Sequence, residues 1–176
     1  PKWVEAITQQ AMKLGHISNL FYSQPYAKLA EKLCQRSGMA AAFFGNSGAE
    51  ANEGMIKLAR KYSFDKYGKG RGTIITLKNS LTATGQEVFH QYFFPFNDGF
   101  RYALAGDMDS LQEVAGHDVC AVMLELVQGE GGVLPMDPEY VHDLAVLCAE
   151  RDWLLLVDEV QTGVGRTGTL FAFQQY

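Results

Sequence analysis

The sequence predicts an α/β fold, with a mostly parallel sheet covered by helices on both of its faces. Short apolar runs, typical of buried strands, alternate along the chain with longer segments of helical periodicity. Parallel strands need a crossover between them, usually a helix, so this alternation favours a parallel sheet. With 176 residues, the chain is also long enough to bury a substantial core.

The first half of the chain predicts three helices and two strands. Apolar residues at helical spacing predict helices over residues 2–14 and 26–36. The apolar run 39–44 predicts a buried strand, which a small-residue turn connects to a long helix over residues 49–67. Residues 73–77 are rich in β-branched side chains and predict the next strand.

The second half begins with an aromatic-rich stretch, residues 89–100, that fits no regular element. We expect a loop whose rings pack in a core or an interface, rather than an aromatic cofactor site. A short helix over residues 109–115 then leads to a strand over residues 119–124. A helix over residues 138–151, with proline at its start, precedes the last strand, residues 153–157.

Composition argues against several classes of protein. A net charge of −5 argues against a nucleic-acid binder, which usually carries a basic surface. No run approaches 18 apolar residues and no signal peptide is visible, so we expect no membrane span. The three cysteines are widely spaced, which predicts reduced, buried thiols in a cytoplasmic protein. The four histidines lack metal-ligand spacing, so we expect no metal site.

The most informative segment is 154–168, where an apolar strand ends in Asp158 and Glu159 and continues into a glycine-rich loop. In open α/β sheets, ligands bind at the carboxyl ends of the strands. Burying Asp158 there is costly unless a cation meets it. The alternative is a strand-terminal acid that caps a turn, which we consider weaker because two other strand ends carry similar signals.

One of these is the segment 45–53, where the predicted strand 39–44 turns directly into a helix. Free N–H groups and the positive end of the helix dipole make such a turn an anion site suited to phosphate. The alternative is a plain helix cap, with Ser47 and Glu50 as a capping box, and the segment alone does not decide. It matches neither common glycine motif for nucleotides.

The other is the segment 125–132, in which Glu125 ends a strand and Glu130 follows in a glycine-containing loop. Taken alone, this segment is better explained as a solvated turn. All three segments nevertheless fall at the same edge of a parallel sheet. A phosphate site beside a buried carboxylate suits pyridoxal 5'-phosphate (PLP), whose ring accepts electrons while its nitrogen is protonated. Asp158 would then meet the pyridinium cation.

The same three segments resemble the class III PLP-dependent aminotransferases, with acetylornithine and ornithine aminotransferases as the most similar branch. They read GNSGAEANE at 45–53, ELVQGEGG at 125–132 and LVDEVQTGVGRTG at 156–168, and HISNLFY at 16–22 also fits that branch. The resemblance covers nearly the whole chain. It implies PLP fold type I, a homodimer with active sites at the subunit interface, and ping-pong transfer of an amino group.

The resemblance also implies roles for individual residues. The backbone of Gly48 and Ala49, with Ser47 beside them, would hold the phosphate, and Asp158 would be the catalytic partner of the pyridinium. Further cofactor contacts are implied for Glu125 at the pocket floor, Glu159 in the same segment, Val160 on the ring face and Gln161 at the ring hydroxyl. Substrate contacts are implied for Tyr22 at the entrance and for Glu130, which resembles an acid that pairs with a switching arginine.

Two departures from the family pattern indicate that the sequence is a partial record of a longer enzyme. The family's Phe-His-Gly-Arg segment is missing between Ser80 and Leu81, where we expect an internal gap. The Schiff-base lysine is expected beyond Tyr176, because every lysine of the chain precedes Asn79. We therefore expect residues 1–176 to be part of a cofactor-binding large domain, without the small C-terminal domain.

The function implied by the resemblance is transfer of the terminal amino group of N-acetylornithine, or a related ω-amino acid, to 2-oxoglutarate, in arginine biosynthesis. The alternatives are another class III enzyme, such as a 4-aminobutyrate or other ω-aminotransferase, or an aminomutase. A non-catalytic fragment is a more remote alternative. We expect small-molecule substrates, and neither nucleic acid nor membrane as a partner.

Overall fold

The computed structural model describes residues 1–18, 20–80, 98–129 and 131–176. These residues form two compact units, Pro1–Phe43 and Phe44–Tyr176. Leu81, on the far side of the expected internal gap, and most of the aromatic stretch 89–100 lie outside the described residues. Among the described helices, none combines the length and the apolar character needed to cross a membrane.

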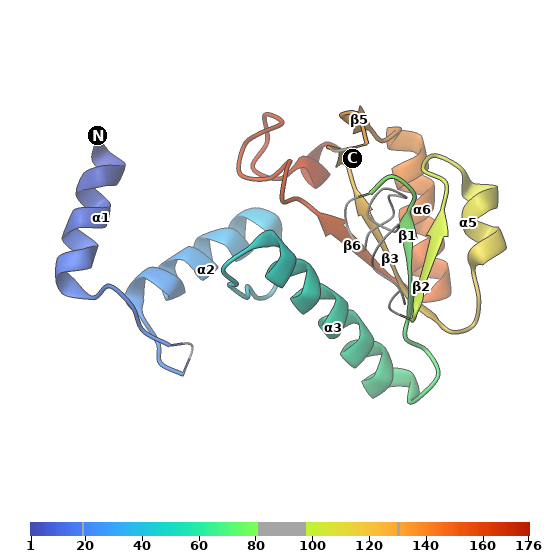
Figure 1. Cartoon of the computed structure of the whole chain (residues 1–176), viewed down its shortest axis with the longest axis horizontal. Coiled ribbons are helices and arrows are strands. Elements are labelled where there is room, and N and C mark those ends of the chain that lie inside the picture. Colours follow the sequence, from blue (N-terminus) through green and yellow to red (C-terminus); the bar gives the residue numbers. More distant parts are fainter. Residues whose placement is uncertain (19, 81–97, 130) are drawn as a thin grey trace, which may run out of the picture. The chain divides into compact units, whose positions relative to one another are not determined.

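The N-terminal unit contains two helices, α1 (Lys2–Lys13) and α2 (Gln24–Ser37), which confirms both helices predicted there (Figure 1). Ser23 precedes α2 with extended backbone angles, and Pro25 lies in the first turn, where a helix needs no N–H donor. Gly38 ends α2 with a φ of 77°, in the left-handed region that glycine adopts without strain.

The strand predicted over residues 39–44 is wrong. Within the described part of the chain, these residues form no regular element and pair with no strand. The side chains of Met39 and Phe43 are 57% and 75% exposed, so neither lies in a core. An apolar run becomes a stable strand only where a neighbouring strand satisfies its backbone hydrogen bonds, and none of the described strands pairs with this run.

The larger unit alternates helices and strands. Its helices are α3 (Gly48–Tyr67), α5 (Met108–Val114), α6 (Pro138–Arg151) and the 3₁₀ helix η2 (Ala172–Gln175). Its strands are β1 (Thr73–Leu77), β2 (Phe100–Ala103), β3 (Val119–Glu125), β4 (Val127–Gln128), β5 (Leu134–Pro135) and β6 (Leu154–Asp158). The three helices and three strands predicted in this part of the chain are confirmed, with ends that differ by one residue at most.

Strand β2 is not predicted by the sequence. Phe100 begins this strand, although the sequence predicts a packed loop over residues 89–100. The strand has four residues, and two of them, Arg101 and Tyr102, are polar or amphipathic. Arg101 donates to Asp118 Oδ2 at 2.8 Å and to the carbonyl of Val114 at 3.0 Å, contacts that an edge strand can accommodate. The apolar run that indicates a central strand is therefore missing here.

Four of the strands form one sheet, in the order β2-β1-β3-β6, and every neighbouring pair is parallel (Figure 1). Strands β4 and β5 form a separate antiparallel pair. The predicted parallel sheet is confirmed. Because the four strands run in one direction, their carboxyl ends lie at the same edge of the sheet.

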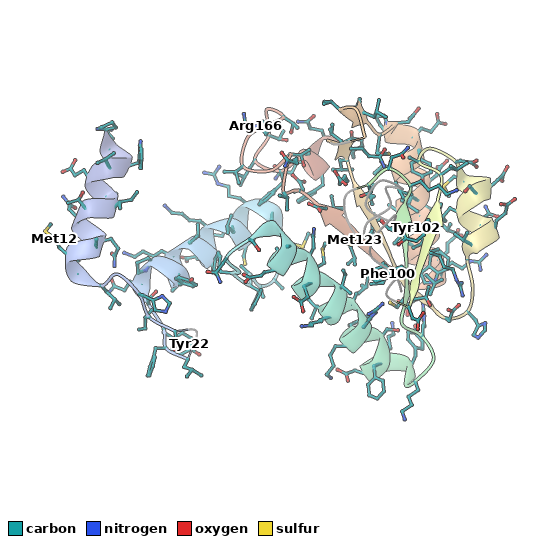
Figure 2. The ribbon with its side chains drawn as sticks, viewed as in Figure 1. Met12, Tyr22, Phe100, Tyr102, Met123 and Arg166 are labelled. Atoms are coloured by element: carbon teal, nitrogen blue, oxygen red, sulfur yellow. The ribbon has the colours of Figure 1, made fainter. Side chains whose placement is uncertain are left out.

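Side chains along the sheet alternate between two hydrophobic clusters, one on each face. Val122 and Leu124 of β3 belong to the cluster that contains buried side chains of α5 and α6. Met123, between them in the same strand (Figure 2), belongs to the other cluster, with Ala59 of α3. This period of two is the pleat of a strand that is buried on both faces. The prediction of helices on both faces is confirmed.

None of the three cysteines, Cys34, Cys120 and Cys148, forms a disulfide. Cys120 and Cys148 are buried, whereas Cys34 is partly exposed. Burial raises the pKa of the Cys148 thiol to about 12 and also raises the pKa of Cys120. Both buried thiols are therefore protonated at neutral pH and act as small apolar side chains.

Candidate functional site

Two acidic residues lie at the carboxyl edge of the sheet. Glu125 is the last residue of β3 and Asp158 is the last residue of β6, and the two are register partners in the parallel ladder. Glu125 is 7% exposed and Asp158 is 8% exposed. Burying two neighbouring carboxylates costs free energy unless hydrogen bonds or a bound cation stabilise them. The hydrogen bonds that hold each one are therefore informative.

Each carboxylate oxygen of Asp158 accepts a hydrogen bond from the chain. The backbone N–H of Val160 donates to Oδ1 at 2.8 Å, in a turn that Asp158 itself closes. The side-chain Nδ2 of Asn52, on α3, donates to Oδ2 at 2.8 Å. The carboxylate is thereby fixed between the turn after β6 and the helix α3.

Glu125 is held from two other directions. The hydroxyl Oγ of Ser80, which is fully buried just after β1, donates to Oε1 of Glu125 at 2.6 Å. The backbone N–H of Gly129, just after β4, lies 3.4 Å from Oε2 and forms a longer hydrogen bond. Glu125 therefore ties the end of β3 to the segments that follow β1 and β4.

The start of α3 has the features of an anion site. Ser47 is the N-cap, and its Oγ accepts a hydrogen bond from the backbone N–H of Glu50 at 3.2 Å. The carboxylate of Glu50 accepts from the backbone N–H of Asn46, so the predicted capping is present in a slightly shifted form. The backbone N–H groups of Gly48 and Ala49, which follow the N-cap, have no hydrogen-bond partner among the described residues. They are the donors that a helix start offers to an anion.

Gly48 also lies against the turn that follows Asp158. A Cβ atom at position 48 would lie 2.8 Å from Cγ2 and 2.9 Å from Cγ1 of Val160, closer than such atoms can approach. A residue without a side chain is therefore required for the start of α3 to approach this turn. The contact brings the candidate anion site close to the segment that carries Asp158.

A cavity of about 760 Å³ connects these features, and all of its lining residues belong to the larger unit. Six of the predicted site residues line it: Gly48, Ala49, Glu125, Asp158, Val160 and Gln161. Its volume is typical of small-molecule sites, which span roughly 300–1,000 Å³. The structure thus brings together residues from three segments that are far apart in the sequence.

The cavity extends along α3 as far as Arg60. The guanidinium of Arg60 donates to the carbonyls of Gly72 and Gly99 at 3.0 and 3.3 Å, and it lies 5.1 Å from the ring centre of Phe100. These contacts fasten α3 to the residue before β1 and to the residue before β2. We therefore assign Arg60 a structural role and place the ligand-binding part of the cavity at the start of α3.

Comparison with known proteins identifies the family. Residues 1–176 match the family model described as aminotransferase class-III. The chain belongs to the class III aminotransferases. It is similar to the acetylornithine aminotransferase of Haemophilus ducreyi, with 55% identity over 185 aligned positions that cover 100% of this chain and 47% of the relative. Class III membership agrees with the resemblance drawn from the three sequence segments.

Solved class III structures share the fold. The N-acetylornithine aminotransferase from Stenotrophomonas maltophilia K279a is 44% identical, with a TM-score of 0.84 over 99% of this chain and 45% of that chain. The ornithine aminotransferase from Toxoplasma gondii is 29% identical, with a TM-score of 0.91 over 99% of this chain and 44% of that chain, and PLP partly occupies its active site. The present chain therefore has PLP fold type I and spans about half the length of the relatives it matches.

Glu159 does not line the cavity, although the class III motif implies a place for it in the cofactor segment. Its carboxylate accepts hydrogen bonds from the backbone N–H groups of Ala172 and Phe173 at 2.8 and 2.9 Å, and from Thr162 Oγ1 at 3.2 Å. Asp158 is the last residue of β6 and Glu159 follows the strand, and the two side chains have different hydrogen-bond partners. It fastens the glycine-rich loop to the start of η2.

Two other predicted site residues belong to the N-terminal unit or lie outside the described residues. Tyr22 belongs to the N-terminal unit, where its side chain is fully exposed on the loop between α1 and α2 (Figure 2). Glu130 lies outside the described residues. Arg166 lies on the exposed glycine-rich loop after β6 and does not line the cavity (Figure 2).

Two residues of the site have no role in the sequence-based prediction. Asn52 and Ser80 each donate a hydrogen bond to one of the two buried carboxylates. A signal for Asn52 does exist, because it is a polar residue on the helix face that continues with Ile56 and Ala59. Ser80 gives no comparable signal, since serine is common wherever a strand ends in a turn.

Proposed function

We propose that the chain is part of a PLP-dependent aminotransferase that moves the terminal amino group of N-acetylornithine to 2-oxoglutarate, a step of arginine biosynthesis. The observation that carries the proposal is the cavity that joins the start of α3 to the buried carboxylate of Asp158. These two features match the charged ends of PLP, its phosphate and its ring nitrogen. The names of the similar acetylornithine aminotransferases supply the substrate.

The residues present fit PLP on the chemistry of their donors and acceptors. The N–H groups of Gly48 and Ala49 are available to phosphate oxygens, and the hydroxyl of Ser47 lies beside them at the N-cap. At the other end, the carboxylate of Asp158 lines the cavity with both oxygens already fixed. The chain thus offers donors to the anionic end of the cofactor and an acceptor to its cationic end.

When bound, PLP supplies an electron sink for the negative charge that develops beside the transferred amino group. The chain's residues would set its position and its protonation. The start of α3 would bind the phosphate, and Asp158 would hold the proton on the ring nitrogen. Val160 would pack on the ring face, Gln161 would donate to the ring hydroxyl oxygen, and Glu125 would form the pocket floor; all three line the same cavity.

The remaining expectations belong to the proposal as well. Tyr22 would line the substrate entrance, and Glu130 would pair with an arginine that switches between the two substrates. The enzyme would act as a homodimer with active sites at the subunit interface. It would work in the cytoplasm, which agrees with three cysteines that form no disulfide.

We further propose that residues are missing from the sequence between Ser80 and Leu81, within a large domain that residues 1–176 represent in part. The alignment with the Haemophilus relative supports this, because its 185 positions exceed the 176 residues of the chain by nine. No lysine or arginine occurs between Lys78 and Arg101, so trypsin would release residues 79–101 as one peptide. If the measured mass of this peptide equals the mass calculated for residues 79–101 of the sequence, the proposed gap is contradicted.

Amine-donor preference of the purified full-length protein tests the proposed function. Donors would be N-acetylornithine, ornithine and 4-aminobutyrate, each with 2-oxoglutarate as acceptor and with glutamate formation as the signal. We expect PLP to co-purify and kcat/KM to be highest for N-acetylornithine. Preference for 4-aminobutyrate would favour the alternative that the protein is a 4-aminobutyrate aminotransferase. Rearrangement of an amine within one substrate would identify an aminomutase, and a protein that binds no PLP would contradict the proposal altogether.

A further inference from the structure

Asn52 is a polar residue on a largely apolar face of α3. Gly48, Asn52, Ile56 and Ala59 follow one another at intervals of three or four residues and therefore share one face of the helix. Ala59 is buried in the cluster beneath the helix, and Ile56 packs against that cluster. A primary amide at such a position is unfavourable unless a hydrogen bond compensates for its lost water. Its partner is the carboxylate of Asp158, 2.8 Å away.

Two of the hydrogen bonds that Asp158 accepts, from Val160 and from Asn52, are not equivalent. The backbone N–H of Val160 belongs to the same turn as Asp158, so it moves with the carboxylate that it binds. Asn52 belongs instead to α3, and it lies one helical turn after Gly48 at the candidate anion site. The Asn52 hydrogen bond therefore fixes Asp158 relative to the element that would hold the phosphate. The distance between the two charged ends of the site depends on it.

The chemistry of the amide suits this position. An ionised carboxylate only accepts hydrogen bonds, so the amide must present its Nδ2 group, and it does so without adding a charge. A lysine or arginine at position 52 would instead neutralise Asp158 and compete with a pyridinium for it. Asparagine orients the carboxylate and leaves its negative charge available to the ring nitrogen.

We infer that Asn52 is a positioning residue that, through its hydrogen bond to Asp158, sets the carboxylate that keeps the PLP ring nitrogen protonated. This inference rests on the proposed function. Asn52 acts through Asp158 and not on the reacting atoms. Its removal is therefore expected to change cofactor affinity and ring protonation while leaving the fold intact.

The test uses the PLP-loaded full-length protein with Asn52→Leu, which has a similar shape and no donor. Two quantities are measured, the dissociation constant for PLP and the ¹⁵N NMR shift of PLP labelled at the ring nitrogen. We expect about tenfold weaker PLP binding, the loss typical of one hydrogen bond to a charged group. We also expect the nitrogen signal to move toward the value of neutral pyridine, which a merely structural role would not produce.

A double-mutant cycle shows whether Asn52 acts through Asp158. Asp158→Asn removes the charge, so Asn52→Leu added to Asp158→Asn should change the PLP dissociation constant less than twofold. Independent effects that multiply in the double variant would overturn the inference. Lys61→Ala is the matched control, because Lys61 is exposed on the same helix and its ion-pair partner among the described residues is nearby Asp65. It should leave both measurements unchanged.

The possible failures can be told apart. If the unchanged protein binds no PLP, the proposed function fails. If it binds PLP and Asp158→Asn weakens that binding, while Asn52→Leu matches the unchanged protein, only the role of Asn52 is overturned. Should Asn52→Leu not fold, Asn52→Ala decides in its place, because alanine favours the helix and adds no bulk. Unchanged affinity and unchanged ¹⁵N shift in Asn52→Ala would then overturn the inference.

Discussion

Glu125 and Asp158 are register partners at the ends of β3 and β6, and both line the same cavity. Their side chains receive hydrogen bonds from neutral donors, which are the hydroxyl of Ser80 for Glu125 and the amide of Asn52 for Asp158. Neutral donors orient a carboxylate and stabilise its charge without cancelling it. These two donors leave the negative charge of the carboxylates in place, which agrees with the proposed pairing of Asp158 with the pyridinium of PLP.

Asp158→Asn tests the assignment of the pyridinium partner. The amide cannot hold a proton on the ring nitrogen, so the electron sink is lost while the shape of the side chain is kept. We expect kcat for transamination by the full-length enzyme to fall about 100- to 1,000-fold, as when one preorganised charge-stabilising group is removed elsewhere. Asp109→Asn, an exposed position in the first turn of α5, is the matched control. Equal rates in the two variants would contradict the assignment.

Gly48→Ala tests the close approach between α3 and the turn after β6. The new methyl group would overlap both Cγ atoms of Val160, so that Val160 or the helix start must shift. We expect the free energy of unfolding, measured with urea, to fall by about 1–3 kcal/mol. PLP binding should also weaken, because the N–H groups at positions 48 and 49 move with the helix start.

Gly72→Ala is the control for this substitution. Apart from the chain neighbours of Gly72, no described residue has an atom within 4 Å of a Cβ at position 72, and the backbone there is outside the left-handed region. Its unfolding free energy and PLP affinity should remain close to those of the unchanged protein. If Gly48→Ala behaved like Gly72→Ala, the start of α3 would not require glycine for its approach to Val160.

The sequence predicts the three apolar strands of the sheet better than strand β2, for a physical reason. Strands β1, β3 and β6 are buried largely by apolar side chains, so each leaves a run that can be recognised without knowledge of its neighbours. Strand β2 contains Arg101, whose pairing with Asp118 cannot be read from periodicity. The run 39–44 shows the opposite error, because it has the composition of a strand but forms no strand within the described part of the chain.

The same distinction applies to the site. Asp158 and the start of α3 could be predicted because strand ends and helix starts have local signatures. The hydrogen bond from Asn52 to Asp158 joins residues 106 positions apart, and no local signature encodes such a pairing. The family resemblance implies that Glu159 belongs to the cofactor segment. Its contacts with η2 depend on how the glycine-rich loop returns, which only the folded chain determines.

Glu159→Ala separates the two roles considered for Glu159. In the structure its carboxylate accepts three hydrogen bonds that hold the glycine-rich loop, so its loss leaves three donors without their acceptor. We expect the free energy of unfolding to fall by about 1–3 kcal/mol. PLP affinity should change far less than in Asp158→Asn. Glu150→Ala, an exposed position in the last turn of α6, is the control.

The opposite pattern would support the role implied by the family motif. A large loss of PLP affinity with unchanged unfolding free energy would place Glu159 in the cofactor site. The two measurements should therefore be made on the same preparations, with unfolding measured both with and without added PLP. Bound ligand stabilises only the folded state, so the difference between the two conditions reports affinity independently of activity.

Tyr140→Phe tests a buried hydroxyl in the core beneath the sheet. Tyr140 of α6 is 6% exposed, and its hydroxyl has no hydrogen-bond partner among the described residues. A buried polar group without a partner lowers stability. Replacing it with phenylalanine at neutral pH is therefore expected to leave the free energy of unfolding unchanged or to raise it by up to about 1 kcal/mol. Tyr102→Phe, on the partly exposed edge strand β2, is the comparison (Figure 2).

Tyr140→Phe is also expected to change how stability depends on pH in the alkaline range. Burial, with smaller contributions from Asp107 and Cys148, raises the pKa of Tyr140 to about 12, above its usual value of 10. Between these values the unfolded chain loses the phenolic proton while the folded chain keeps it, so stability falls as the pH rises from 10 to 12. Tyr140→Phe should remove this part of the decline. If the free energy of unfolding, measured with urea, fell equally with pH in both proteins between pH 10 and 12, the Tyr140 hydroxyl would have to be solvated in the folded protein.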